Sequence, residues 1–74
     1  MDKTEMVNMT LAMYVDACGL EAVAAWDENE ENQKRADVAR SRYEGARLLV
    51  AEMLHISEHA VDDDMEYLMC EGTL

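Results

Sequence analysis

The sequence contains no proline and only three glycines among its 74 residues. Proline and glycine are the residues that most strongly disfavour helix interiors, so little in this chain interrupts a helix. The commonest residues are instead alanine, glutamate, methionine, leucine and aspartate. We therefore predict an all-α fold, and at this length residues 1–74 are expected to form a single small helical domain.

Cysteine is scarce as well, since Cys18 and Cys70 are the only two. Two cysteines cannot supply a disulfide framework, and we expect both to be small buried hydrophobes in a reducing cytoplasm.

The start of the chain lacks a secretory segment, and Asp16 and Glu21 interrupt its most apolar stretch, so we expect no membrane contact. A core this thin favours a partner subunit.

Basic residues are few, because six lysines and arginines face seventeen acids and the net charge is −11. Such a charge repels phosphates and anionic lipids, which excludes direct nucleic-acid binding, and it attracts basic protein surfaces. Residues 1–31 hold eight acids and one base, residues 32–47 two acids and five bases, and residues 48–74 seven acids and no base. Two acidic tracts thus flank one basic patch, although the charge also serves solubility.

The first predicted helix covers about residues 4–27, begins at Asp2 or Thr4 and continues through Gly19. Apolar residues three or four apart mark its expected inner face, namely Met6, Met9, Met13, Ala17, Leu20 and Ala24. Other apolar residues lie off this stripe, namely Val7, Leu11, Tyr14, Val15, Cys18 and Trp26. A helix that is apolar around most of its circumference needs more than one neighbour, which predicts a dimer or a bound partner.

The second predicted helix covers about residues 30–54 and forms an antiparallel hairpin with the first. Its expected inner face consists of Ala36, Ala39, Tyr43, Ala46, Val50, Met53 and Leu54, with Val38 and Leu49 on its flank. Charged residues are expected to face away, namely Asp37, Arg40, Glu44 and Arg47. Across the hairpin, the residues assigned to the core or to a dimer interface are Met6, Met9, Met13, Leu20, Tyr43, Val50 and Met53.

The polar break between these helices has the sequence DENEEN and places Asp27, Asn29 and Glu31 at the first, third and fifth positions of a calcium-loop pattern. The pattern then fails, because Asn32 replaces the turn glycine and Val38 replaces the bidentate glutamate. We predict a turn followed by the acidic first turn of a helix, with i,i+4 ion pairs from Glu30 to Lys34 and from Glu31 to Arg35.

A third helix is predicted over about residues 58–70, capped by Ser57 and ended by Gly72, with residues 73 and 74 fraying. Its expected inward residues are Val61, Met65, Leu68 and Met69.

The letters H-x-x-E-H from His55 to His59 resemble the inverted zinc-protease signature over five residues. That chemistry requires both histidines on one helical face, whereas the cap at Ser57 separates them. A structural zinc held by His55, His59 and Cys70 is a second interpretation, and two exposed histidines near carboxylates are a third. We expect no metal and no cofactor.

Catalytic motifs are missing, because the chain has no phosphate-cradling glycine loop, no G-x-S-x-G turn and no Cys–His pair, so we do not expect an enzyme.

Acids one helical turn apart are about 6 Å apart, comparable with the phosphate spacing of a nucleic-acid strand. The acids expected to bind a partner are Glu58, Asp62, Asp63, Asp64, Glu66 and Glu71, with Asp27 and Glu28 in the turn.

Two functions fit these features. The first is a non-enzymatic inhibitor or regulator that blocks a basic nucleic-acid-binding surface of a partner protein, and nucleic-acid mimicry is one way in which it would do so. In size and composition the chain is similar to small phage and mobile-element products that block host defence or transcription. The second is a homodimeric helical adaptor that binds through apolar and aromatic residues, with Trp26, Tyr14 and Tyr43 as contact candidates.

Overall fold

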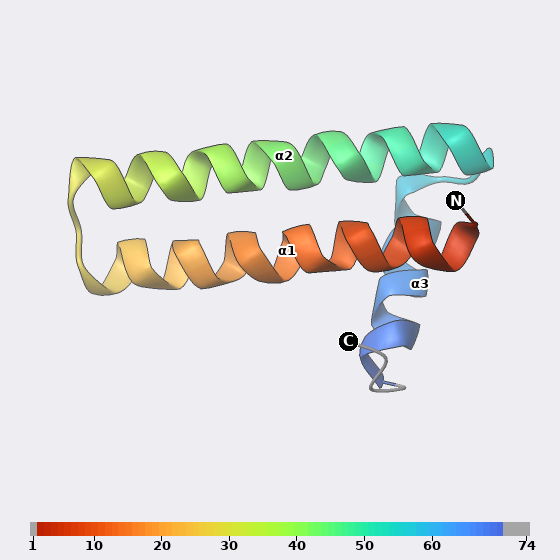
Figure 1. Ribbon diagram of the computed structural model, residues 1–74, viewed down its shortest axis with the longest axis horizontal. Helices are drawn as coiled ribbons and strands as arrows, with labels where there is room; N and C mark the ends of the chain where they lie inside the picture. Colours follow the sequence, from red (N-terminus) through yellow and green to blue (C-terminus); the bar gives the residue numbers. More distant parts are fainter. Residues whose placement is uncertain (1, 71–74) are drawn as a thin grey trace.

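The computed structural model describes residues 2–70, which fold into α1 (Lys3–Trp26), α2 (Glu30–Leu54) and α3 (Glu58–Cys70). The all-α prediction is confirmed, and no strand occurs in these residues. Helices α1 and α2 run antiparallel along the whole molecule, and α3 crosses steeply behind α1 near the open end of the hairpin (Figure 1). No helix of the described part is long and apolar enough to cross a membrane.

Helix α1 begins at the predicted cap Asp2, whose Oδ1 accepts a hydrogen bond from the Glu5 backbone N–H at 2.8 Å. This bond satisfies one of the backbone donors that the first turn of a helix leaves without a partner. The helix then runs unbroken through Gly19, as predicted, and a Cβ atom at that position would meet no atom within 4 Å outside the adjacent backbone of its own helix. It ends at Trp26, where the Asp27 N–H donates to the Val23 carbonyl.

The turn between α1 and α2 is held by asparagines. Asn29 caps α2 by accepting a hydrogen bond from the Asn32 backbone N–H at 2.8 Å, and the Asn32 side chain donates to the Asp27 carbonyl at 2.9 Å. Asn32 at the position where a calcium loop has glycine therefore has a structural role of its own. Of the two predicted i,i+4 pairs, the one between Glu31 and Arg35 forms at 2.7 Å.

Helix α2 ends in a left-handed residue, His55, with φ 57° and ψ 42°. The His55 N–H donates to the carbonyls of Ala51 and Glu52, and the Ile56 N–H donates to the Ala51 carbonyl. This is a Schellman arrangement, in which glycine is the usual residue because a Cβ atom disfavours positive φ. His55 therefore holds a strained position.

Replacing His55 with glycine is expected to raise the free energy of unfolding by about 0.5–1 kcal/mol, because glycine relieves the left-handed strain and the exposed imidazole makes no core contact. Chemical denaturation followed by circular dichroism measures the change. His59→Gly is the matched control, since it places glycine inside α3 and is expected to lower the same free energy by about 1 kcal/mol. A loss of stability in His55→Gly would show that the left-handed residue is not strained.

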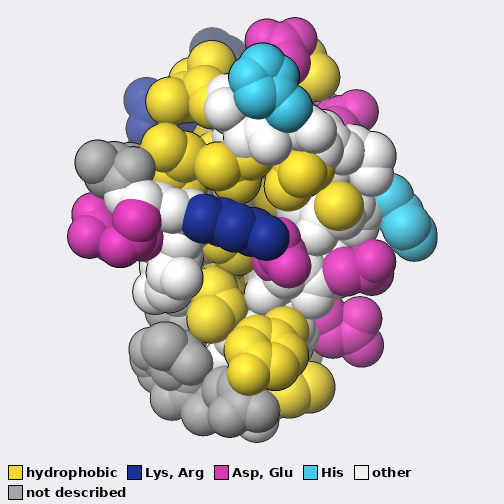
Figure 2. Space-filling view, turned by 90° about the vertical axis from the view of Figure 1, so that its right-hand side faces the viewer, with side chains coloured by type: hydrophobic (Ala, Val, Ile, Leu, Met, Phe, Trp, Pro, Cys, Tyr) yellow, Lys and Arg dark blue, Asp and Glu magenta, His cyan; other side chains and the backbone are white. Residues whose placement is uncertain are grey.

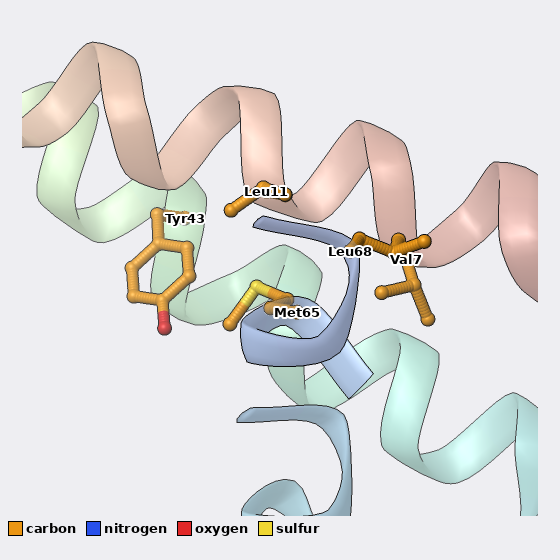
Figure 3. Packing of buried hydrophobic residues seen from close by; sticks show 5 residues of the cluster. All are labelled: Val7, Leu11, Tyr43, Met65 and Leu68. Carbon is orange, nitrogen blue, oxygen red and sulfur yellow. The ribbon is translucent and has the colours of Figure 1, made fainter. Parts of the chain in front are cut away.

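The core lies where α3 meets the hairpin (Figure 3). Val7 and Leu11 from α1, Tyr43 from α2, and Met65 and Leu68 from α3 converge there, and Leu11 is fully buried. A second cluster consists of Val50, Ala51 and Val61, with Met6, Leu54 and Ile56 packed against it.

The predicted inner stripe of α1 is only partly right. Ala17 and Ala24 are buried, but Met9 is 50% exposed and Met13 is 37% exposed, while Val7 and Leu11 fill the core instead. Met53, expected on the inner face of α2, is also 54% exposed. The reason is that α1 carries two apolar stripes, and the one that touches both α2 and α3 becomes the core.

Helix α3 follows its prediction closely. The Ser57 Oγ accepts a hydrogen bond from the Ala60 N–H at 3.1 Å, and Val61, Met65 and Leu68 are buried. The inward placement of Met69 is wrong, because its side chain is 54% exposed.

The expectation that both cysteines are buried is also wrong. Cys18 is half-buried, Cys70 is exposed, and both are free thiols. Gly72, the predicted end of α3, and the following residues 73 and 74 lie outside the described part of the chain.

Candidate protein-binding surfaces

Arg47 joins α2 to α3 through two carboxylates. Its Nε and Nη2 donate to the two oxygens of Asp62 at 2.7 and 2.6 Å, and its Nη1 donates to Glu58 at 3.1 Å. The prediction that Arg47 faces away from the fold is therefore wrong. Hydrogen bonding to Arg47 lowers the pKa of Asp62, and the same bond raises the pKa of Arg47. These three residues form the α2–α3 clamp.

Arg40 was also expected to face away, yet it joins α2 to α1. Its Nε donates to Glu21 at 2.9 Å, and its Nη2 donates to the other oxygen of the same carboxylate. The guanidinium lies over the rings of Tyr14 and Tyr43, 5.8 and 5.4 Å from their centroids. The hydrogen bond from Arg40 lowers the pKa of Glu21.

The two tyrosine rings are themselves packed together, with centroids 5.1 Å apart. A hydrogen bond with Cys18 raises the pKa of Tyr14, and burial raises the pKa of Tyr43. Tyr43 belongs to the core cluster and Tyr14 packs against it. Both rings therefore serve the fold, and neither is an exposed contact residue.

The acids of α3 do not form one continuous free row. Glu58 and Asp62 turn toward Arg47, while Asp64 pairs with Lys3 of α1 at 3.2 Å. Two of the predicted partner-binding acids of α3 remain exposed, namely Asp63 and Glu66, and Glu71 lies outside the described residues. Figure 2 shows acidic side chains at the top and on both sides of this end of the molecule, with hydrophobic side chains across the middle.

The second acidic surface is the hairpin tip, which we define as Trp26, Asp27, Glu28, Asn29 and Glu30. Trp26 is 93% exposed, the highest value among the exposed large hydrophobic residues of the described chain, and the other four residues are exposed as well. Within residues 2–70, no ion pair engages Asp27, Glu28 or Glu30. The tip thus presents an indole beside three unpaired carboxylates.

The two histidines of the letters H-x-x-E-H do not lie on one helix. His55 caps α2 and His59 lies in α3, so the two histidines belong to different elements, as predicted. Across the described range 2–70, no group of three or more His, Cys, Asp or Glu side chains is placed to hold a metal ion.

A third surface is apolar and lies between α1 and α2, with no α3 residue lining it. We call it the methionine face, and it consists of Met6, Met9, Met13, Ala46, Leu49, Val50 and Met53, with Thr10 between them. Toward the hairpin tip, the same groove continues between Asp16 and Leu20 on α1 and Lys34, Arg35, Val38 and Arg42 on α2. The spacing of Met6, Met9 and Met13 was visible in the sequence, but only the structure shows that Met9 and Met13 are exposed while Met6 packs against the second core cluster.

No family model, curated protein or solved structure matches this chain. In residues 2–70 its fold and surfaces define a small acidic protein with three helices, an aromatic acidic tip and an uncovered apolar face.

Proposed function

We propose that this protein is a non-enzymatic regulator that binds a basic, nucleic-acid-binding surface of a partner protein and blocks it. The observation that carries the proposal is the hairpin tip, where Trp26 is 93% exposed beside three unpaired carboxylates. An exposed tryptophan is an unfavourable surface residue unless it is covered, and tryptophan is among the residues enriched at the energetic centres of interfaces.

The chemistry of the tip favours a cationic partner surface. Arginine and lysine stack on the face of an indole ring, and the same cations pair with carboxylates. Asp27, Glu28 and Glu30 lie within four residues of Trp26, so one basic patch can contact all of them. Surfaces that bind nucleic acid are rich in such cations.

The exposed acids of α3 support the same function from the other end of the molecule. Asp63 and Glu66 are exposed and carry charge that a basic partner surface can neutralise. Asp62 and Glu58 contribute less, because Arg47 already holds them. Nucleic-acid mimicry by this chain therefore rests on the tip and on Asp63 and Glu66 rather than on a continuous row along α3.

Replacing Trp26 with alanine is expected to weaken partner binding by at least about tenfold, because a central aromatic anchor contributes more than about 1.4 kcal/mol. The substitution removes no core contact, so the fold is expected to remain intact. Capture of proteins from cell extract on the immobilised chain measures the effect. The matched control is Tyr67→Ala, which removes a 64% exposed aromatic residue from α3.

The contribution of charge is tested in the same way. Asp27→Asn with Glu28→Gln is expected to reduce capture at low salt, whereas Glu44→Gln with Glu52→Gln changes the net charge equally at exposed positions of α2 and is expected to leave capture unchanged. Equal losses in both pairs would mean that net charge, and not the tip, attracts the partner. Unchanged capture in Trp26→Ala and in the tip pair would overturn the proposal.

The methionine face favours a second candidate function, a homodimeric helical adaptor. Met9, Leu49 and Met53 are each at least half exposed, and such clustered apolar surface indicates a binding site. Dimer formation and tip binding use different surfaces, so the two functions are compatible.

A further inference from the structure

We propose that a second copy of this chain packs on the methionine face, so that two hairpins form a four-helix bundle with each α3 on the outside. This inference rests on the second candidate function, the homodimer, and assigns its interface and orientation. It is independent of what the hairpin tip binds.

The spacing of the uncovered residues is that of a bundle seam. Along α1, Met6, Met9, Met13, Asp16 and Leu20 follow one another at intervals of three and four residues. Along α2, the corresponding positions are Arg35, Val38, Arg42, Ala46, Leu49 and Met53. Each helix already uses another stripe for the core of its own chain, and a second stripe of this period requires a second helical neighbour.

The face is large enough for a stable dimer. The molecule is 38 Å long, and the hairpin runs along that axis. Two helices side by side are about 20 Å wide, so this whole side of the hairpin, the methionine face together with the groove toward the tip, offers on the order of 700 Å² per copy. Standard interfaces bury about 800 Å² per partner, which is of the same size.

Charge opposes self-association on most of this molecule, because each copy carries −11. The groove that continues the methionine face is different, since Lys34, Arg35 and Arg42 line it beside Asp16 and Glu31. The repulsion between two copies is therefore weaker on this face than at the acidic tip or along the outer side of α3.

The same charges select an orientation. If the two-fold axis runs parallel to the hairpin, α1 of one copy lies beside α2 of the other. The methionine face of one copy then meets the methionine face of the other, and Asp16 lies beside Arg42 of the second copy. If the reversed hairpins overlap along their whole length, the methionine end of each copy lies against the groove of the other that Lys34, Arg35 and Arg42 line, so apolar side chains cover charged ones. We therefore assign the orientation that pairs Asp16 with Arg42.

Sedimentation equilibrium of the full chain over a range of concentrations tests the interface. The wild type is expected to reach the mass of two chains, and Met9→Ser or Leu49→Ser is expected to raise the dimer dissociation constant by at least about tenfold. The control is Val15→Ser, which changes an apolar residue of similar exposure on another side of α1 and is expected to leave the constant unchanged. Circular dichroism of each variant confirms that the helices remain folded.

Charge reversal tests the orientation. Asp16→Arg and Arg42→Asp are each expected to weaken the dimer, and the double variant is expected to restore it. A double variant no stronger than the single ones would overturn the orientation, and a wild type with the mass of one chain at every concentration would overturn the interface. Trp26→Ala is expected to dimerise normally, so failure of the dimer and failure of partner binding at the tip are separate results.

Discussion

Replacing Leu11 with alanine is expected to lower the free energy of unfolding by about 3 kcal/mol, whereas Met9→Ala is expected to lower it by less than about 1 kcal/mol. Leu11 is fully buried among residues of all three helices, so its truncation removes apolar contacts and leaves a cavity. Met9 is half exposed, and its side chain gains much less from folding.

The measurement is chemical denaturation followed by circular dichroism, at a protein concentration low enough that only single chains are present. Under that condition, Met9 contributes nothing through a second copy, and the comparison reports the core of one chain. Because stabilities of small domains are only about 5–15 kcal/mol, a loss of this size in Leu11→Ala is a large fraction of the total. Equal effects of the two substitutions would contradict the placement of the α1 core stripe.

Replacing Arg47 with methionine is expected to lower the free energy of unfolding by about 2 kcal/mol at neutral pH. The substitution removes three charge-assisted hydrogen bonds and leaves Asp62 and Glu58 beside each other without a cation. Partial solvent exposure of the two carboxylates, 37% for Asp62 and 44% for Glu58, keeps this value well below that of a buried pair. Arg47→Lys is expected to be intermediate, because lysine keeps the charge but not the bidentate geometry.

The pH dependence of the free energy of unfolding tests whether Asp62 is the carboxylate through which Arg47 stabilises the fold. Arg47 lowers the pKa of Asp62 in the folded chain, so this carboxylate stabilises the fold above its unfolded pKa of about 3.9 and the stabilisation is lost as the pH falls through the lower, folded value. The difference in the free energy of unfolding between wild type and Arg47→Met is therefore expected to become smaller at acidic pH. Arg42→Met, measured at a concentration low enough that only single chains are present, is the control, since Arg42 is exposed and forms no ion pair within residues 2–70. A difference that stays constant down to pH 2 would show that the clamp is not electrostatic.

Much of the fold was predictable from local chemistry. Helix ends are fixed by residues near them in sequence, as at Asp2 and Ser57, whose side chains accept hydrogen bonds from the first turns of α1 and α3. The short amphipathic pattern of α3 also predicted its buried residues, because Val61, Met65 and Leu68 form one narrow stripe.

The inner face of α1 was not predictable in the same way. Its two apolar stripes both have helical spacing, so periodicity alone cannot choose between Met9 and Leu11. The choice depends on where α3 packs, which is a tertiary property. The same limit applies to Arg40 and Arg47, whose carboxylate partners Glu21 and Asp62 are 19 and 15 residues away along the chain.

The candidate binding surfaces also combine features that the sequence predicts with features that depend on tertiary structure. That the turn and α3 are acidic follows from composition, and Trp26 was recognisable as a contact candidate. What the structure adds is the distinction between paired and unpaired carboxylates, because Arg47 and Lys3 hold Glu58, Asp62 and Asp64. Paired acids are partly neutralised, so the proposed binding surface moves from the whole of α3 to the hairpin tip and to Asp63 and Glu66.

The most direct test of the proposed function is a competition measurement on a protein captured from cell extract by the immobilised chain at low salt. Fluorescence anisotropy of a labelled nucleic acid bound to that partner is recorded while the wild-type chain is added. The proposal predicts that the nucleic acid is released as the chain binds, that Trp26→Ala is at least about tenfold weaker in releasing it, and that high salt abolishes the competition. A partner that binds the chain and the nucleic acid at the same time, or one that is retained at high salt, would contradict it.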